Sequence, residues 1–335
     1  MDEVFKIDSI YMSLTVGFAV TESGPEAVAG DYFTALELGS SLSTRFGWQA
    51  VYLPRGESWY DLTGIDVLVV MLQDYDLRKI HGFKPNLVKV GWARNWFEDW
   101  CAKSTFIGYD LLLASSSYAA RYMSERIGKL VRVMRIATNS KRFDFNLRSI
   151  SPTWDVAFTG TYWQSDRDIV DALIELPDHL HIAVFGKHWE QVPKITKWHK
   201  GFVPYKQLSS VYSEAAIVID DSNHVTKEWG AANSRVFDAL AAGCLVITNS
   251  ASVSDEVFDG LLPVYQNPSH LAELVEMYLK DEEARLGLQK RLRDIVIKMH
   301  QYKHRAIELG LKLGNLGYIT RDPNSTSMFL ENRKL

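Results

Sequence analysis

The chain has 335 residues, of which 47% are hydrophobic and 23% charged, and its formal net charge is -4. This length allows two domains of ordinary size, and the composition is typical of a globular protein rather than a disordered one. Acidic and basic residues are mixed along the chain, so nothing attracts it generally to nucleic acid or to anionic lipid. We therefore expect no nucleic-acid partner.

The sequence also bears on the compartment. The two cysteines, Cys101 and Cys244, fit a reducing compartment, and Cys244 is expected in the core. The start, MDEVFKID, lacks the features of a signal peptide, and no apolar run approaches the ~20 residues that span a bilayer. We predict a cytoplasmic protein without a transmembrane segment. Peripheral association with a membrane or a larger complex stays open. It also stays open whether the chain is a fragment of a longer protein.

Strand-like and helix-like segments alternate, which is typical of a parallel α/β architecture. In the first half, one helix is predicted to follow the loop Thr21–Asp31 and end at Phe46, and another is predicted over Ser117–Ile127. The predicted strands are Ser9–Phe18, Trp48–Leu53, Ile65–Leu72, Leu87–Trp92, Leu111–Ala114 and Leu130–Ile136. A polar segment, Thr138–Pro152, is the predicted linker. Residues 1–150 are therefore expected to form one Rossmann-like domain.

The alternation restarts after this linker. The predicted strands are Trp154–Thr159, His181–Phe185, Ala216–Asp220 and Cys244–Thr248, and the predicted helices are Asp166–Leu176, Tyr205–Glu214, a helix that stops at Gly243, Pro268–Leu279 and Glu282–Lys298. Two successive series predict two Rossmann-like domains facing each other across a cleft, with residues 151–315 in the second.

The segment Glu228–Gly260 carries the most informative pattern. A turn-rich stretch leads into an apolar-periodic helix and then into a short buried strand. A loop that feeds a helix N-terminus presents backbone N–H groups to an anion such as a diphosphate. Arg235 lies in the first helical turn. Asp238 follows three residues later on the same face, where its carboxylate can accept hydrogen bonds from a ribose diol.

The string NSRVFDALAAGCLVIT, residues 233–248, resembles the donor-binding segment of GT-B glycosyltransferases, in particular the CgeB-like and group 1 branch. The resemblance implies an α/β protein of GT-B fold, with a nucleotide-sugar donor in the second domain and the acceptor at the first. Retaining families carry two glutamates here. The ribose glutamate corresponds to Asp238, but the sugar glutamate corresponds to Gly230, so the stereochemistry stays open. The tail, 316–335, is a candidate to pack back on the first domain.

The resemblance also implies donor-site residues in the second domain. Backbone groups of Asn233, Ser234, Gly160 and Thr161 are expected near the nucleotide, Val203 near the base, and Tyr205 and Gln207 beside it. Arg167 and Lys187 are candidates for the diphosphate, where a cation stabilises the departing charge. For Arg167 and Lys187 the alternative is a solvated surface charge, and for Tyr205 and Gln207 it is an ordinary helix cap.

The first domain is expected to bind the acceptor. Asp31 ends a glycine-bearing loop and is the candidate general base if the reaction inverts. The alternative is that it caps the following helix. Four aromatic residues, Trp92, Trp96, Phe97 and Trp100, are interleaved with polar ones and suit a sugar, although such spacing is also typical of a core.

Three further motifs are weaker. The loop 220–224 begins with paired carboxylates that can face the cleft, hold Mg²⁺ or form internal turn bonds. Asp74-Tyr75-Asp76 has the form of the GT-A metal motif, but that fold has one domain. His300 and His304 are four apart on an expected helix and lack the glutamate of a zinc motif, so surface positions are expected.

We therefore predict a metal-independent glycosyltransferase without a cofactor. It would move a sugar from a nucleotide-diphosphate sugar to a hydroxyl of a glycan or glycoconjugate, as in polysaccharide biosynthesis. Two alternatives stay open, namely a nucleotide-sugar epimerase of GT-B fold and a non-catalytic glycan- or nucleotide-binding module.

Overall fold

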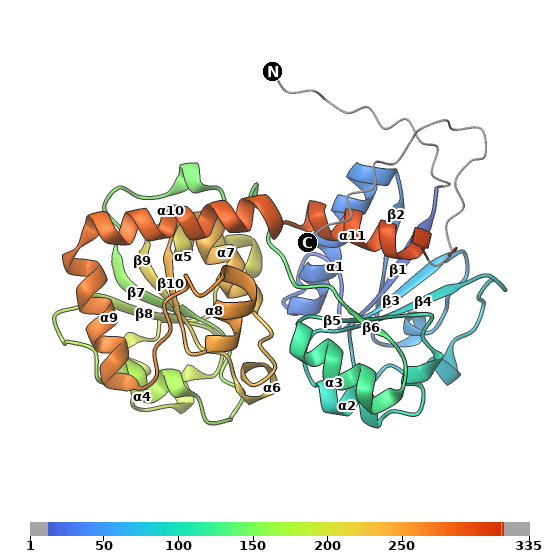
Figure 1. Cartoon of the computed structure of the whole chain (residues 1–335), viewed down its shortest axis with the longest axis horizontal. Helices are drawn as coiled ribbons and strands as arrows, with labels where there is room; N and C mark the ends of the chain where they lie inside the picture. The colour runs from blue at the N-terminus through green and yellow to red at the C-terminus, as the bar shows by residue number, and fades with distance from the viewer. Residues whose placement is uncertain (1–12, 316, 318–335) are drawn as a thin grey trace, which may run out of the picture.

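The computed structural model describes residues 13–315 and 317, and they form two parallel β-sheets, each covered by helices (Figure 1). The first sheet has the strand order β2-β1-β3-β4-β5-β6, and the second has the order β10-β9-β7-β8. Every pairing between these strands is parallel. The predicted α/β class with two Rossmann-like domains is confirmed.

The strands are short and mostly buried, as expected of parallel sheets with helices on both faces. Their bounds are β1 Thr15–Val20, β2 Gln49–Pro54, β3 Val67–Val70, β4 Val88–Ala93, β5 Leu111–Ala114, β6 Val131–Val133, β7 Trp154–Thr159, β8 Ile182–Phe185, β9 Ala215–Asp220 and β10 Leu245–Thr248. All of the predicted strands are present. The first begins at Thr15 rather than Ser9, and Ser9 itself lies outside the described residues.

The α-helices join and cover these strands. Their bounds are α1 Gly30–Phe46, α2 Phe97–Ala102, α3 Ser117–Ile127, α4 Asp168–Ile174, α5 Leu208–Ser213, α6 His224–Lys227, α7 Ser234–Ala242, α8 Ala251–Phe258, α9 Pro268–Lys280, α10 Glu282–Met299 and α11 Tyr302–Asn315. The sequence patterns missed α2, α6, α8 and α11. The first three have eight residues or fewer, too short for a clear helical period.

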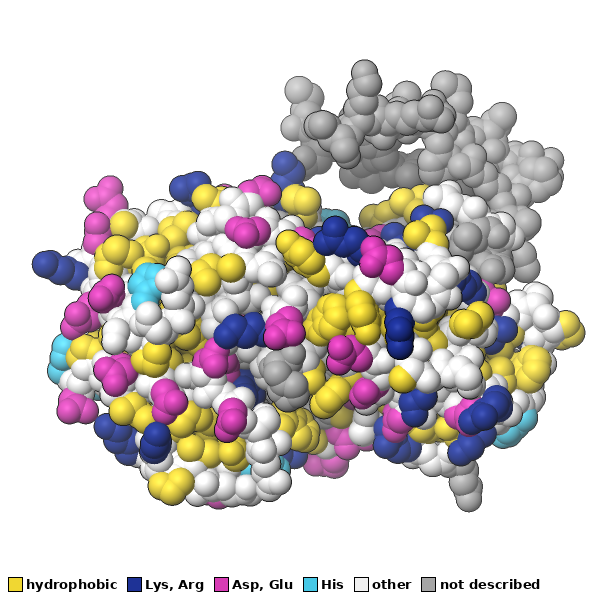
Figure 2. Space-filling view, turned by 60° about the horizontal axis from the view of Figure 1, so that its bottom comes forward, with side chains coloured by type: hydrophobic (Ala, Val, Ile, Leu, Met, Phe, Trp, Pro, Cys, Tyr) yellow, Lys and Arg dark blue, Asp and Glu magenta, His cyan; other side chains and the backbone are white. Residues whose placement is uncertain are grey.

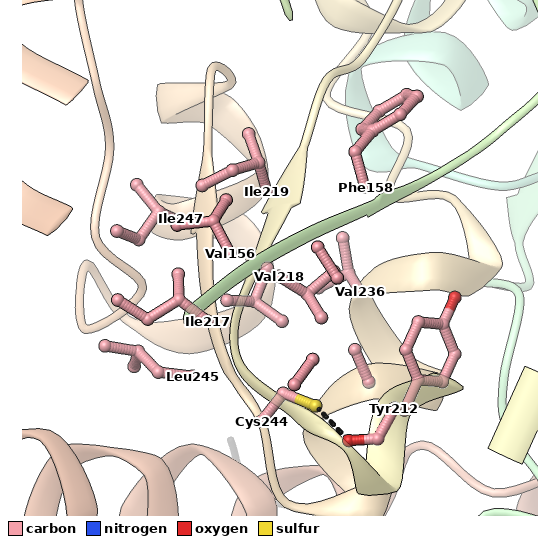
Figure 3. Close-up of a cluster of buried hydrophobic side chains, with 14 of the residues drawn as sticks. Val156, Phe158, Tyr212, Ile217, Val218, Ile219, Val236, Cys244, Leu245 and Ile247 are labelled. Carbon is pink, nitrogen blue, oxygen red and sulfur yellow. Dashed lines mark hydrogen bonds between the residues drawn. The ribbon is translucent and has the colours of Figure 1, made fainter. Parts of the chain in front are cut away.

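The core of the second domain is built where β7, β9 and β10 meet α7 (Figure 3). Val156, Ile217 and Ile247 are fully or almost fully buried. Cys244 is also buried, and its thiol donates a hydrogen bond to the carbonyl of Tyr212 at 3.0 Å. The predicted core position of Cys244 is therefore confirmed.

The chain passes between the domains twice, and the two crossings lie side by side. The N–H of Thr138 donates to the carbonyl of His300, and the N–H of Tyr302 donates to the carbonyl of Thr138, both at 3.0 Å. After the second crossing, α11 packs on α1 and buries Leu309 and Leu313 in the core of the first sheet. The predicted second domain, residues 151–315, therefore included a helix that packs on the first.

Two predictions concern the remainder of the chain. The tail, 316–335, lies outside the described residues apart from Gly317, so its packing stays a prediction. None of the helices formed by residues 13–315 has the length and apolar character needed to cross a membrane.

On the face shown in Figure 2, acidic and basic side chains are interspersed, consistent with the small net charge.

Candidate functional site

Two adjoining cavities lie between the domains, with volumes of about 350 Å³ and 670 Å³. The first is lined mainly by loops at the carboxyl ends of the second sheet. The second lies between the ends of β3 and β4 and the loop before α7. This is the side of a parallel sheet on which ligands bind. The two cavities share six of their lining residues, namely Gly30, Asn95, Trp163, Thr226, Asn233 and Ser234. The two cavities therefore form one cleft.

Helix α7 begins at the wall of the first cavity. Its cap is Asn233, whose Oδ1 accepts a hydrogen bond from the N–H of Arg235 at 3.0 Å. The Asn233 Nδ2 donates to Oδ1 of Asp220 at 2.6 Å. The helix ends at Gly243, which has a left-handed φ of 92°. This local arrangement directs Ser234, Arg235 and Asp238 toward the cavity, which all three line.

Two arginines face the same cavity, and each is paired with a buried carboxylate. Arg235 Nη1 lies 2.8 Å from Oδ1 of Asp220, and Arg167 Nε lies 2.6 Å from Oδ2 of Asp221. Both guanidinium groups also lie against the ring of Phe158, at 4.6 Å and 5.7 Å from its centroid. Burial raises the pKa of Asp221, and the Arg167 charge opposes that rise. The ion pairs therefore hold two cations at the cavity wall.

The alternative interpretation of Arg167 as a solvated charge is wrong. Its side chain is only 5% exposed, and the residue precedes α4 instead of lying within it. Lys187 is placed differently, because its Nζ lies over the ring of Phe202, 4.7 Å from the centroid. Phe202 lines the first cavity, whereas Lys187 is not among the residues that line it.

Asp238 lies in the interior, and its residue is 1% exposed. The hydroxyl of Thr138, in the first domain crossing, donates a hydrogen bond to its Oδ1 at 2.6 Å. Burial raises the pKa of Asp238 well above its ordinary value. The predicted ribose ligand thus lines the cavity and also contacts the segment that joins the domains.

Other predicted donor residues gather at the same cavity. It is lined by Gly160, Thr161, Val203 and Tyr205, while Gln207 is not among the lining residues. The ring of Tyr205 stacks on Phe33 of the first domain with 4.5 Å between centroids. Tyr205 belongs to a short 3-10 helix, Tyr205–Gln207, whose cap is Pro204 without a side-chain hydrogen bond. Tyr205 is therefore not a helix cap, whereas Gln207 is the N-cap residue of α5 and makes no side-chain cap hydrogen bond.

Asp31 lines the second cavity and is 7% exposed. Its Oδ2 accepts a hydrogen bond from the N–H of Thr21 at 2.6 Å. Helix α1 begins one residue earlier, at Gly30, and its cap is Ala29. Asp31 therefore does not cap the helix. The Arg94 guanidinium lines the same cavity, donates to Thr34 Oγ1 at 3.0 Å and has a pKa lowered by burial.

The aromatic cluster of the first domain is mostly core. Trp92, Phe97 and Trp100 are at most 2% exposed, whereas Trp96 is 42% exposed and lines the second cavity. Trp163 lines both cavities and is 71% exposed, and it was not among the predicted site residues. The available signal was a tryptophan three residues after Gly160, in the loop that follows a predicted strand.

The weaker motifs take structural roles. In the loop 220–224, both carboxylates are engaged by arginines, although Asp221 and Asn223 also line the first cavity. Asp76 accepts hydrogen bonds from Arg78. Within residues 13–315 and 317, no group of three or more His, Cys, Asp or Glu side chains is placed to hold a metal ion.

The expected surface position is wrong for His300, which is buried and accepts a hydrogen bond from Arg305. His304 is partly exposed. The two histidines do not share one helix, because His300 follows the end of α10 and His304 lies in α11.

Comparisons with known proteins agree with this architecture. The family model described as glycosyl transferase-like matches residues 159–310. A glycosyltransferase from Rickettsia africae superposes with a TM-score of 0.59 at 11% identity, covering 94% of this chain and 100% of that one. Sucrose-phosphate synthase from Thermosynechococcus elongatus has a TM-score of 0.63 at 14% identity, covering 91% and 99%. HepE of Anabaena, solved with UDP-glucose, has a TM-score of 0.63 at 12% identity, covering 90% and 100%. No curated protein sequence matches the chain significantly.

The two facing Rossmann-like domains, with the cleft between them, define the GT-B fold. The chain has this fold, and residues 159–310 of its second domain match the glycosyl transferase-like family. The resemblance found in the sequence is thereby confirmed.

Proposed function

We propose that this glycosyltransferase moves a sugar from a nucleotide-diphosphate sugar to a hydroxyl of a glycan or glycoconjugate, in the cytoplasm and without a metal or cofactor. The observation that carries the proposal is the convergence of two paired arginines and the capped start of α7 on one cavity. Guanidinium groups and a helix N-terminus together suit a diphosphate. The Anabaena relative of the same fold was solved with UDP and with UDP-glucose.

The donor would extend along the first cavity. Val203 and Tyr205 would contact the base, and Asp238 would accept hydrogen bonds from the ribose hydroxyls. The backbone groups of Asn233 and Ser234, with Gly160 and Thr161, would lie along the diphosphate beside Arg235 and Arg167. Lys187 stays a candidate for the diphosphate, since its ammonium lies over the ring of Phe202, which lines the cavity.

The reaction would take place where the two cavities meet. An acceptor hydroxyl forms a bond to the anomeric carbon while the bond from that carbon to the diphosphate oxygen breaks. The bonding electrons leave with the diphosphate, whose charge Arg167 and Arg235 would stabilise. If the configuration inverts, the carboxylate of Asp31 would take the hydroxyl proton, and the cavity that it lines would hold the acceptor.

A thermal-shift panel tests the donor site. Wild type and Asp238→Ala are melted with UDP, GDP, dTDP, CDP and ADP, with and without Mg²⁺. A ligand that binds only the folded state raises the melting temperature, so we expect one nucleotide to stand out without Mg²⁺. Loss of a buried hydrogen-bond partner should weaken its binding by roughly 1–3 kcal/mol in the variant. No response to any nucleotide would refute the proposal.

The matching sugar nucleotide then separates the three candidate functions. Release of nucleotide that depends on an added acceptor indicates transfer. Conversion of the sugar without an acceptor indicates an epimerase, and binding without any turnover indicates a non-catalytic module.

A further inference from the structure

The loop between β7 and α4 holds one large aromatic side chain in the cleft. Trp163 is 71% exposed, the most exposed tryptophan among the described residues. A large apolar side chain that stays exposed in a concave site is often a ligand contact.

The backbone around Trp163 is anchored on both sides. The N–H of Tyr162 donates to the carbonyl of Lys187 at 3.0 Å, and the Tyr162 ring packs on Trp189, with 5.3 Å between centroids. Gln164 adopts a left-handed φ of 56° and donates to Gln191. Arg167 closes the loop through its ion pair with Asp221. These contacts hold the loop that carries Trp163 at the wall of the cleft.

The position of Trp163 along the cleft indicates what it contacts. The proposed base contacts, Val203 and Tyr205, line only the first cavity, and Asp31 and Arg94 line only the second. Trp163 lines both, so it lies at their junction. In a bound donor the order is base, ribose, diphosphate and sugar. The transferred sugar would therefore occupy the junction, between the diphosphate site and the acceptor side.

The chemistry of the junction suits a sugar ring. The six residues that line both cavities provide two side-chain amides, from Asn95 and Asn233, two hydroxyls, from Thr226 and Ser234, and one indole. None of the six carries a charge. A pyranose has one face of C–H groups, which packs on an aromatic ring, and an edge of hydroxyls that bond to amides and hydroxyls.

We propose that Trp163 is the stacking platform for the transferred sugar, and that its indole makes the cleft prefer a sugar nucleotide over the bare nucleoside diphosphate. The inference rests on the proposed function, because it needs a nucleotide-sugar donor in the first cavity.

The test compares matched ligands by isothermal titration calorimetry. The pairs are UDP and UDP-glucose, GDP and GDP-mannose, and dTDP and dTDP-glucose. In the pair that wild type binds, Trp163→Ala should lower the affinity for the sugar nucleotide about tenfold. The affinity for the nucleoside diphosphate should change less than about twofold. Trp163→Phe should keep most of the preference. Because the indole is exposed, the melting temperature should stay near that of wild type.

A second exposed aromatic residue provides the control for this test. Phe83→Ala removes another exposed aromatic ring, 49% exposed, from a position outside both cavities, and should change neither affinity. Equal weakening of both ligands by Trp163→Ala would place the indole on the base or diphosphate and overturn the proposal. Unchanged affinity for both would also overturn it. If wild type binds nucleoside diphosphates but shows no preference for the sugar nucleotide, only this proposal fails. If wild type binds none of these ligands and also responds to no nucleotide in the thermal-shift panel, the proposed function fails with it.

Discussion

Asp238 combines a proposed binding role with an unfavourable environment. The side chain is buried beside Thr138, and burial raises its pKa well above the ordinary value. Arg142 partly offsets this rise, and Glu37 adds to it. An ionised carboxylate in such a place costs stability unless a ligand satisfies it. Function at this residue therefore opposes stability.

The sign of this effect gives a prediction for Asp238→Asn. Since the folded state raises the pKa of Asp238, its contribution to stability is present below about pH 4 and is lost as pH rises toward the folded pKa. The amide is neutral throughout. We therefore expect Asp238→Asn to exceed wild type in unfolding free energy by roughly 1–3 kcal/mol at neutral pH, with the difference shrinking toward pH 4. Urea unfolding at pH 4, 6 and 8 measures it.

Glu37 provides the matched control. It is 2% exposed, but Arg142 Nε lies 2.7 Å from its Oε1. Removing one partner of a buried ion pair is destabilising, so Glu37→Gln should lower the unfolding free energy. A stability of Asp238→Asn below that of wild type at pH 8 would contradict the assigned pKa direction.

At the scale of elements, the ends of β7 and β8 approach each other closely at the first cavity. Gly186, after β8, has a φ of 153°, and its N–H donates to the carbonyl of Gly201 at 2.9 Å. A Cβ at Gly186 would lie 1.9 Å from the carbonyl oxygen of Gly160. The close approach of these two loops, which shapes the cavity wall, therefore requires glycine at this position.

This contact predicts that Gly186→Ala will destabilise the protein by at least ~3 kcal/mol, because backbone atoms of the Gly160 loop must move. Gly201→Ala is the control. Gly201 has a φ of 89°, but a Cβ there would meet nothing within 4 Å, so only the left-handed backbone penalty of about 1–2 kcal/mol is expected. Chemical denaturation compares the two, and equal losses would contradict the predicted clash.

At the scale of the whole molecule, contacts on several sides of the cleft hold the domains together. Glu256 of α8 is paired with Arg135 and accepts a hydrogen bond from the N–H of Ser117 at the start of α3. Elsewhere Tyr205 stacks on Phe33, and Lys206 donates to the carbonyl of Pro25 at 3.3 Å. The two crossings pair through a parallel bridge between Thr138 and Gln301. These contacts join the two domains on several sides of the cleft.

We predict that Glu256→Ala shifts the population toward an open arrangement. Loss of charge-assisted hydrogen bonds across the interface should favour opening by about 1–3 kcal/mol. Small-angle X-ray scattering without nucleotide should then give a larger radius of gyration than wild type, and saturating nucleotide should remove the difference. Asp171→Ala breaks a surface pair with Lys194 inside the second domain and should leave the radius unchanged. An unchanged radius for Glu256→Ala would show that this contact does not hold the cleft closed.

Much of the fold and part of the candidate site could be predicted from local pattern. The apolar runs that became β5 and β7, the cap before α7 and the stop at Gly243 are properties of consecutive residues. Residues 233–238 lie within two turns of one helix, so their arrangement follows from its period. The sequence by itself thus determined two parallel α/β domains. It also determined helix α7, which carries several of the proposed donor contacts.

Only the tertiary structure decided which distant residues meet. The sheet order β10-β9-β7-β8 places Arg235 against Asp220 and Arg167 against Asp221. The role of Trp163 depends on a first domain that lies across the cleft, and the placement of α11 depends on the path of the second crossing. Such pairings join residues far apart in the chain, and no local period or propensity specifies them because their free energy arises only when the two surfaces pack together.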